Sequence, residues 1–309
     1  HDALPISFAS VVLCVLCALL ALTAISGNGI VIFVIWSTRE LHSPSLVLLQ
    51  LLAASDFLVG LVGQPFFVAF KIAESLRYFS AYCNLRLIQF FSGWITSGVS
   101  FITLSAISVD RLLALILHLR YKNIITVRRV IIAVIVVWLV CSIVTILKFW
   151  VQNWIIIAVC TNLLAAVVIA FCTGKIFRIA RRHERRIKEQ NVAITLNPSL
   201  AGDFNVRKCK KSAMTVIYIF GLMLMLYIPF FAVMAVEIIK GKTNLVKVAY
   251  EWASLIVFIN SSVNPVIYCW RMKQIRNGIK RFFGRLICPR IASSCCIHLV
   301  GLAAGSERS

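Results

Sequence analysis

The sequence contains few charged residues. Only 14% of its 309 residues are charged, whereas 61% are hydrophobic, and a soluble globular domain has about 25% charged residues. The apolar residues also come in long blocks. This composition excludes a soluble enzyme, a disordered protein and a secreted disulfide scaffold, and it indicates a membrane protein.

Acidic residues are the rarest of the charges. They number 11 against 32 Lys and Arg, which gives a formal net charge of +21. Nucleic-acid binding would require these bases on a folded soluble face. Here they lie almost wholly between the apolar blocks, so we expect no nucleic-acid partner.

Signatures of catalysis are also missing. The chain has no HExxH or GxSxG motif, and its 11 Cys show no paired zinc-ligand spacing. Most Cys lie inside the apolar blocks, where this side chain behaves as a small hydrophobe. We therefore expect a protein that is not an enzyme.

Seven apolar blocks are long enough to cross a bilayer, which takes about 20 helical residues. The spacers between them are short, except for a polar and basic one at 181–208. The blocks cover residues 8–36, 43–70, 84–117, 127–149, 153–180, 209–238 and 245–269. An eighth segment, 271–286, interleaves apolar and basic residues at helical spacing, which predicts an amphipathic helix on the membrane surface. The expected fold class is an all-α membrane protein, a seven-transmembrane helix bundle with a short amphipathic eighth helix.

The basic residues predict the orientation of this bundle. One set of block ends carries 25 Lys and Arg against 6 acids, whereas the opposite set carries 7 against 4. Because basic loops stay in the cytoplasm, the N-terminus is expected outside and the C-terminus inside. We expect a transmembrane domain at 1–286 and a cytoplasmic tail at 287–309. The chain begins with His1 rather than Met, so we also expect a fragment or a trimmed product.

An ionisable group inside a membrane span is costly and therefore indicates function. The second block contains one such group, Asp56. Polar residues on other blocks that could face it are Asn28, Ser100, Asn260, Ser261 and Asn264. This group predicts a small-cation or proton site, and a self-satisfied packing network is the alternative. Asp110-Arg111, at the basic end of the third block, has the position of an ordinary interfacial ion pair.

Several of these residues form an ordered series, with one motif in each span except the fifth. The motifs are Gly27-Asn28, Leu52 with Asp56, Asp110-Arg111, Trp138, Pro229 and Asn264-Pro265-Val266-Ile267-Tyr268. Over residues 20–285 the series resembles the rhodopsin-like (class A) family of G-protein-coupled receptors. Segments 119–126 and 180–183 look like the branch containing adenosine, melanocortin, cannabinoid and lysophospholipid receptors, nearest to the melanocortin side.

This resemblance implies a signalling mechanism. Ligand binding would tilt span six outward and open a cytoplasmic cavity for a heterotrimeric G protein at the plasma membrane. The switch residues would be Asp110, Arg111, Tyr227, Pro229, Asn264, Pro265 and Tyr268. The Asp56 group would hold Na⁺ as an allosteric ion, and no other cofactor is expected. Cys288 directly follows the amphipathic helix, which is expected to contact membrane lipids. This cysteine is a candidate for palmitoylation.

The resemblance also implies a ligand cup in the outer half of the bundle. Its lining would be Phe66, Arg86, Gln89, Phe90, Gly93, Trp94, Ser97, Tyr227, Phe230, Phe231, Met234, Trp252 and Ile256, with Pro65 beside them. Gly93 stands where amine receptors place a carboxylate, and Arg86 lies near the mouth. We therefore expect an apolar or anionic amphipathic ligand, a small molecule, lipid or peptide, rather than a monoamine. The alternative for Arg86 is a side chain that extends to water without binding anything.

The sequence departs from the family pattern at several switch positions. Leu112 replaces the Tyr after the Asp-Arg pair, and Tyr227 replaces the aromatic switch Trp. Cys209 stands where many relatives have an acidic partner for Arg111, so we expect basal activity. Cys83 has no cysteine within reach on the outer loops, and no outer disulfide is expected. A ligand-independent receptor, or less favourably a transporter or channel, therefore stays an alternative.

Overall fold

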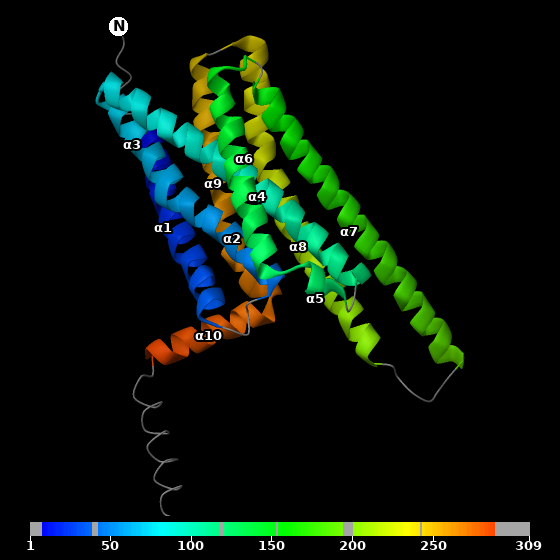
Figure 1. Ribbon diagram of the computed structural model, residues 1–309. Helices are drawn as coiled ribbons and strands as arrows, with labels where there is room; N and C mark the ends of the chain where they lie inside the picture. The colour runs from blue at the N-terminus through cyan, green and yellow to red at the C-terminus, as the bar shows by residue number, and fades with distance from the viewer. Residues whose placement is uncertain are drawn as a thin grey trace, which may run out of the picture.

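The computed structural model describes residues 8–38, 43–117, 120–152, 154–193, 200–241 and 243–287. Within these ranges, seven helical segments are long and apolar enough to cross a membrane. Figure 1 shows them packed side by side, with one further helix lying across the lower end of the bundle. The predicted seven-helix bundle with an eighth helix is therefore confirmed.

The spans follow the chain in order. The first three are α1 (Phe8–Ser37), then α2 (Pro44–Leu58) continued by the π-helical turn η2 (Val59–Gly63) and α3 (Gln64–Ser75), then α4 (Phe79–Leu117). The last four are α6 (Val127–Ile146) with its 3₁₀ extension η4 (Leu147–Phe149), α7 (Trp154–Ala193), α8 (Leu200–Lys240) and α9 (Asn244–Arg271). The short α5 (Tyr121–Ile124) connects α4 to α6, and α10 (Lys273–Ile287) is the surface helix.

The polar spacer at 181–208 is helical for most of its length. α7 continues to Ala193 and α8 begins at Leu200, so both helices extend beyond their apolar blocks. Hydropathy marks only the part of a helix that lies in lipid. Arg, Lys, Glu and Gln are good helix formers, and they continue a helix into water without any apolar signal.

Two glycines lie where neighbouring helices pack closely together. A Cβ atom on Gly60, in η2, would lie 3.0 Å from side-chain atoms of Ala24 and Ile25 on α1. A Cβ on Gly27 would lie 3.0 Å from the ring of Pro265 on α9. Both distances are shorter than most real Cβ contacts, so a larger residue would push the neighbouring side chains away, and these glycines allow α1 to approach both neighbours.

The surface helix α10 is anchored by its apolar side. Ile275 is fully buried, and the ring of Phe282 packs against Phe33 of α1 with centroids 5.1 Å apart. The helix lies across the end of α1 and α9 (Figure 1). Its basic residues Lys273 and Lys280 are exposed, as expected for a helix lying in the membrane interface.

Candidate functional site

The carboxyl group of Asp56 lies at the centre of a buried polar group. Only 1% of the residue is exposed, and the amide of Asn264 donates a 2.7 Å hydrogen bond to Oδ2. Ser261, one turn away on α9, interacts with the same carboxyl. α2 and α9 thus meet at this point through a side-chain contact between residues 208 positions apart.

The other residues predicted around Asp56 lie close by. Asn28 donates from its amide to the backbone carbonyls of Ala24 and Ser261, each at 2.9 Å. The hydroxyl of Ser100 hydrogen-bonds that of Ser55 at 3.0 Å. Asn260 and Ser261 line the same cavity as Asp56 and Ser100. The predicted residues therefore gather from α1, α4 and α9 around α2.

Several buried oxygens in this group have no hydrogen-bond partner among the described residues. They are the side-chain carbonyl oxygens of Asn28, Asn260 and Asn264 and the hydroxyl of Tyr268. Buried polar atoms are rarely left unsatisfied without an ion or water beside them. A carboxylate together with neutral amide and hydroxyl oxygens is the kind of ligand set that hard cations prefer. The residues therefore fit a small cation such as Na⁺.

A cavity of about 60 Å³ extends from Asp56 toward the end of the bundle opposite α10. Eight of the residues predicted for the ligand cup line it, from α4 and α8. These are Gln89, Phe90, Gly93, Trp94, Ser97, Tyr227, Phe230 and Phe231. The polar group and the cup thus share one continuous space.

Five residues predicted for the cup do not line this cavity. They are Phe66, Arg86, Met234, Trp252 and Ile256. Trp252 packs instead on an apolar cluster that includes Leu13 of α1 and Phe258. The α9 face that does line the cavity contains Tyr250, Ser254 and Phe258, which differ from the predicted positions by a rotation about the helix axis. Helical spacing alone could have found this face, because Phe258 is one turn and Ser254 two turns before the predicted Ser261.

Tyr227 lines the cavity from α8, the helix that contains Pro229. Its hydroxyl hydrogen-bonds that of Ser97 on α4 at 2.9 Å, and its ring packs edge-on against Phe101 with centroids 5.3 Å apart. Pro229 lies two residues further along α8. A proline inside a helix removes a backbone hydrogen bond and permits a bend. A change in the cavity at Tyr227 therefore acts directly beside the flexible point of α8.

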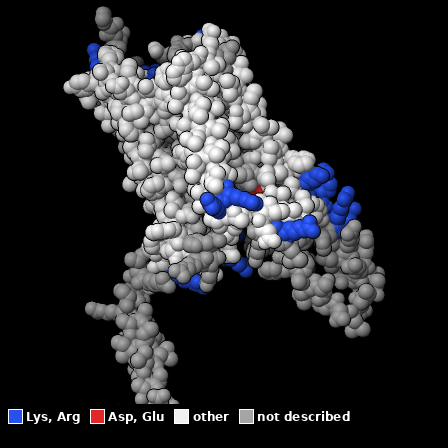
Figure 2. Space-filling view, viewed as in Figure 1, with Lys and Arg blue, Asp and Glu red and all other residues white. Residues whose placement is uncertain are grey.

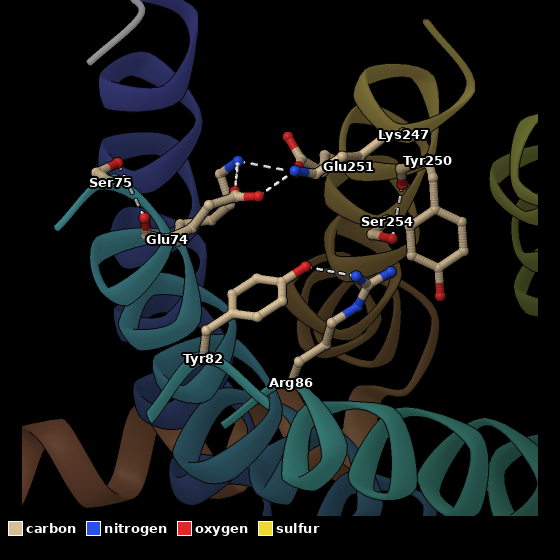
Figure 3. A network of polar contacts seen from close by, with 9 residues as sticks. Glu74, Ser75, Tyr82, Arg86, Lys247, Tyr250, Glu251 and Ser254 are labelled. Carbon is tan, nitrogen blue, oxygen red and sulfur yellow. Dashed lines mark hydrogen bonds and ion pairs between the residues drawn. The ribbon is translucent and has the colours of Figure 1, made fainter. Parts of the chain in front are cut away.

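Ion pairs join α3 and α9 at the end of the bundle opposite α10, and the sequence argument missed them. The ammonium of Lys71 lies 2.7 Å from Glu74 and 2.8 Å from Glu251. Figure 3 shows these two acidic residues on facing helices. Lys247 also pairs with Glu74. Lys71 is 5% exposed and Glu251 8%, so both charges are buried and each is satisfied by the other.

Arg86 lies beside this network at the mouth of the cavity. It is exposed and hydrogen-bonds the hydroxyl of Tyr82, and its guanidinium is 5.6 Å from the centre of that ring. Figure 3 shows the guanidinium pointing between Tyr82 and Tyr250, which lines the cavity. Arg86 is thus positioned at the entrance rather than in the lining.

At the end of the bundle that carries α10, Asp110 accepts bonds from three directions. Arg111 pairs with its Oδ2 at 2.8 Å, Ser45 of α2 donates to the same oxygen at 2.6 Å, and the hydroxyl of Tyr121 donates to Oδ1. Ser45 and Tyr121 were not predicted. Burial and the neighbouring carboxylate raise the pKa of Tyr121 to about 12. Tyr121 therefore stays protonated and donates at physiological pH.

The remaining switch residues lie on α9. Pro265 packs against Gly27, while the side chain of Tyr268 is fully buried in the core. Cys288, the predicted lipidation site, lies outside the described residues. The cysteines whose side chains are described are unpaired; they are Cys14, Cys17, Cys83, Cys141, Cys160, Cys172 and Cys269.

Comparison with known proteins identifies the family. Residues 27–157 and 150–268 match the family model described as "7 transmembrane receptor (rhodopsin family)". The chain belongs to this family. It is therefore a multi-pass membrane receptor and not an enzyme.

Individual relatives of the receptor are distant but cover most of its length. It is 28% identical to melanocortin receptor 3 of Mus musculus over 264 residues, covering 82% of this chain and 79% of that protein. It is 26% identical to trace amine-associated receptor 9 of Mus musculus, with 83% and 80% covered. It is 24% identical to the histamine H2 receptor of Cavia porcellus, with 87% and 77% covered. The predicted similarity to melanocortin receptors is therefore found among these relatives, whereas the predicted similarity to adenosine receptors is not supported.

Proposed function

We propose that this receptor senses an extracellular ligand at the plasma membrane and activates heterotrimeric G proteins. In this proposal the end that carries Asp110 and α10 lies in the cytoplasm and the N-terminus lies outside. The excess of Lys and Arg at the proposed cytoplasmic ends supports this orientation.

One observation carries the proposal. A single cavity runs from the aromatic residues Phe90 and Trp94 to Asp56, and Tyr227 forms part of its wall two residues from Pro229. A ligand in this space would alter the contact between Tyr227 and Ser97. The outward movement of α8 about Pro229 would then release its cytoplasmic half from α4 and α9 and admit a G protein.

The Asp56 group would hold Na⁺ as an allosteric ion. The unpartnered amide oxygens of Asn28, Asn260 and Asn264, on helices that meet at Asp56, support this assignment. Because the cation lies in the same cavity as the ligand, a ligand that contracts the lower cavity would expel it. Sodium and ligand would therefore oppose each other's binding, and the coupling would be reciprocal.

The chemistry of the cavity supports an apolar or anionic ligand. Aromatic rings dominate its upper lining, and Arg86 lies at its mouth. The described lining contains one acidic residue, Asp56, at the bottom. Gly93 stands at the level where an amine ligand would need a carboxylate.

The decisive experiment is a ligand-library screen on cells that express the receptor with biosensors for the dissociation of G proteins of each class. We expect hits among apolar or anionic amphiphiles, and their signal should vanish in Arg111→Ala at equal surface expression. A signal that persists in Arg111→Ala, or an ion current that replaces the G-protein signal, would contradict the proposal.

A ligand-independent receptor is the second candidate function. The cavity of about 60 Å³ holds only a few water molecules, whereas ligand pockets usually measure about 300–1,000 Å³. A receptor that signals without ligand would retain its full activity when Trp94→Ala enlarges the cavity. A ligand-gated receptor would gain or lose ligand response in the same variant.

A further inference from the structure

Four arginines form a stripe along one side of α7. Arg178, Arg181, Arg182 and Arg185 are all exposed, and their spacing of three and four residues places them on one helix face. With Gly174 and Phe177 they line a hollow of about 300 Å³ on the surface. The absence of a side chain at Gly174 leaves this hollow open at its upper end.

The stripe faces away from the helix bundle. The buried residues of α7 in this region are Cys172, Thr173, Ile176 and Ala180, and Ile176 and Ala180 pack with Leu115 of α4. Successive helical residues are about 100° apart. The arginines are therefore centred about 180° from this packed face. A protein that enters between the helices would meet the packed face and not the stripe.

The same side of α7 faces the lipid tails higher in the membrane. Leu164, Val167 and Phe171 are strongly exposed, and steps of seven residues lead from Leu164 through Phe171 to Arg178 and Arg185. The apolar part of this span ends at Arg182. The stripe thus begins where lipid tails give way to headgroups, and Figure 2 shows Lys and Arg gathered along this lower part of the molecule.

Charge complementarity defines the occupant of this hollow. Between Lys175 and Lys188 the chain has seven Lys and Arg and one acid, Glu184. Among the residues whose side chains are described, which do not include Glu184, no acid forms an ion pair with the four arginines. Arg presents a planar fork of donors that binds phosphate oxygens in pairs. Four guanidinium groups along about 11 Å of helix match a lipid headgroup with several phosphates better than a headgroup with a single charge.

We propose that the outer face of α7 binds the polyphosphorylated headgroup of an inner-leaflet phosphoinositide through Arg178, Arg181, Arg182 and Arg185. The proposal rests on the proposed orientation of the bundle but not on signalling. The competing explanation is that these bases only fix the membrane topology.

Native mass spectrometry of the purified receptor in detergent can test the site directly. Phosphatidylinositol bisphosphate, phosphatidylserine and water-soluble inositol trisphosphate are titrated separately. The test variant changes all four stripe residues to Gln. A control variant of equal charge change is Arg207→Gln/Lys208→Gln/Lys210→Gln/Lys211→Gln, at the start of α8. A second variant changes the four stripe residues to Lys, which keeps the charge and removes the forks.

We expect one phosphatidylinositol bisphosphate to bind the wild type more tightly than phosphatidylserine. Its apparent affinity should fall at least tenfold in the Gln stripe variant, about threefold or more in the Lys variant, and twofold or less in the α8 control. Equal losses in the stripe and control variants would show diffuse charge only and overturn the site. Binding of inositol trisphosphate as tight as that of the lipid would overturn the membrane lipid as its occupant. Because the stripe residues are exposed, the thermal unfolding of all variants should stay close to that of the wild type, which verifies that they are folded.

Discussion

The ion pairs between α3 and α9 predict how strongly different substitutions destabilise the receptor. The order of these destabilisations tests the structure better than the size of any one of them. Lys71 contacts two carboxylates, those of Glu74 and Glu251. Its side chain is 6% exposed and that of Glu251 11%. Single deletions in this network of four charges therefore leave different charges behind.

Lys71→Met should be the most destabilising change. It leaves the buried carboxylate of Glu251 without a cation, and breaking a buried pair in this way costs about 3–5 kcal/mol. Glu251→Gln is milder, because Lys71 still pairs with Glu74 at 2.7 Å. We expect about 1.5–3 kcal/mol for that change, the range for a hydrogen bond to a charged group.

Lys247→Met is the matched control. Its side chain is 45% exposed, and a surface ion pair contributes about 0–1 kcal/mol. The double variant Lys71→Met/Glu251→Gln removes both buried charges, so it should be more stable than Lys71→Met alone. Recovery in the double variant is the specific sign of a buried pair.

The assay is thermal unfolding of the purified receptor in one detergent at one heating rate, since the unfolding of such a protein is irreversible. With roughly 2 °C or more per kcal/mol, Lys71→Met should lower Tm by about 6 °C or more. If Glu251→Gln lowers Tm as much as Lys71→Met does, or if the double variant shows no recovery, the buried pair does not exist as described.

Three further predictions concern the switch and the outer surface. Asp56→Asn should abolish any effect of sodium on the ligand response, measured over a series of sodium concentrations. An unchanged sodium effect would contradict the proposal that the Asp56 group binds sodium. Asp110→Asn should raise basal G-protein signalling, because Arg111 loses its ion-pair partner, whereas Arg111→Ala should abolish that signalling; a silent wild type with a silent Asp110→Asn would refute this account. Cys83 should carry a free thiol in an alkylation experiment read by mass spectrometry, and an intramolecular disulfide there would refute the expectation.

The sequence predicted the spans and most of the polar group because their signals are local or strongly constrained. An apolar block of 20 or more residues has few structures other than a membrane helix. A carboxylate inside such a block must find partners, and few polar residues were available to surround Asp56. The family resemblance then ordered these residues along the chain, and the hydrogen bond between Asn264 and Asp56 agrees with it.

The ion pairs and the bonds to Asp110 could not be predicted in the same way. Lys71 and Glu251 are 180 positions apart, and at the ends of spans their charges were counted only for topology. Their pairing depends on the rotation and depth of α3 relative to α9. The same rotation decides that Tyr250 and not Trp252 faces the cavity. Ser45 and Tyr121 likewise reach Asp110 only because α2 and α5 are packed around the end of α4.

The position of Asp56 in the same cavity as the aromatic cup residues has a consequence for excitable cells. Under the proposed orientation, a cation would reach the carboxyl from the outer side only and would cross about half of the membrane's electric field. A full crossing corresponds to about 2.3 kcal/mol per 100 mV, so half corresponds to about 1 kcal/mol. The apparent affinity for sodium would then change about fivefold per 100 mV. The receptor would respond to membrane voltage as well as to ligand.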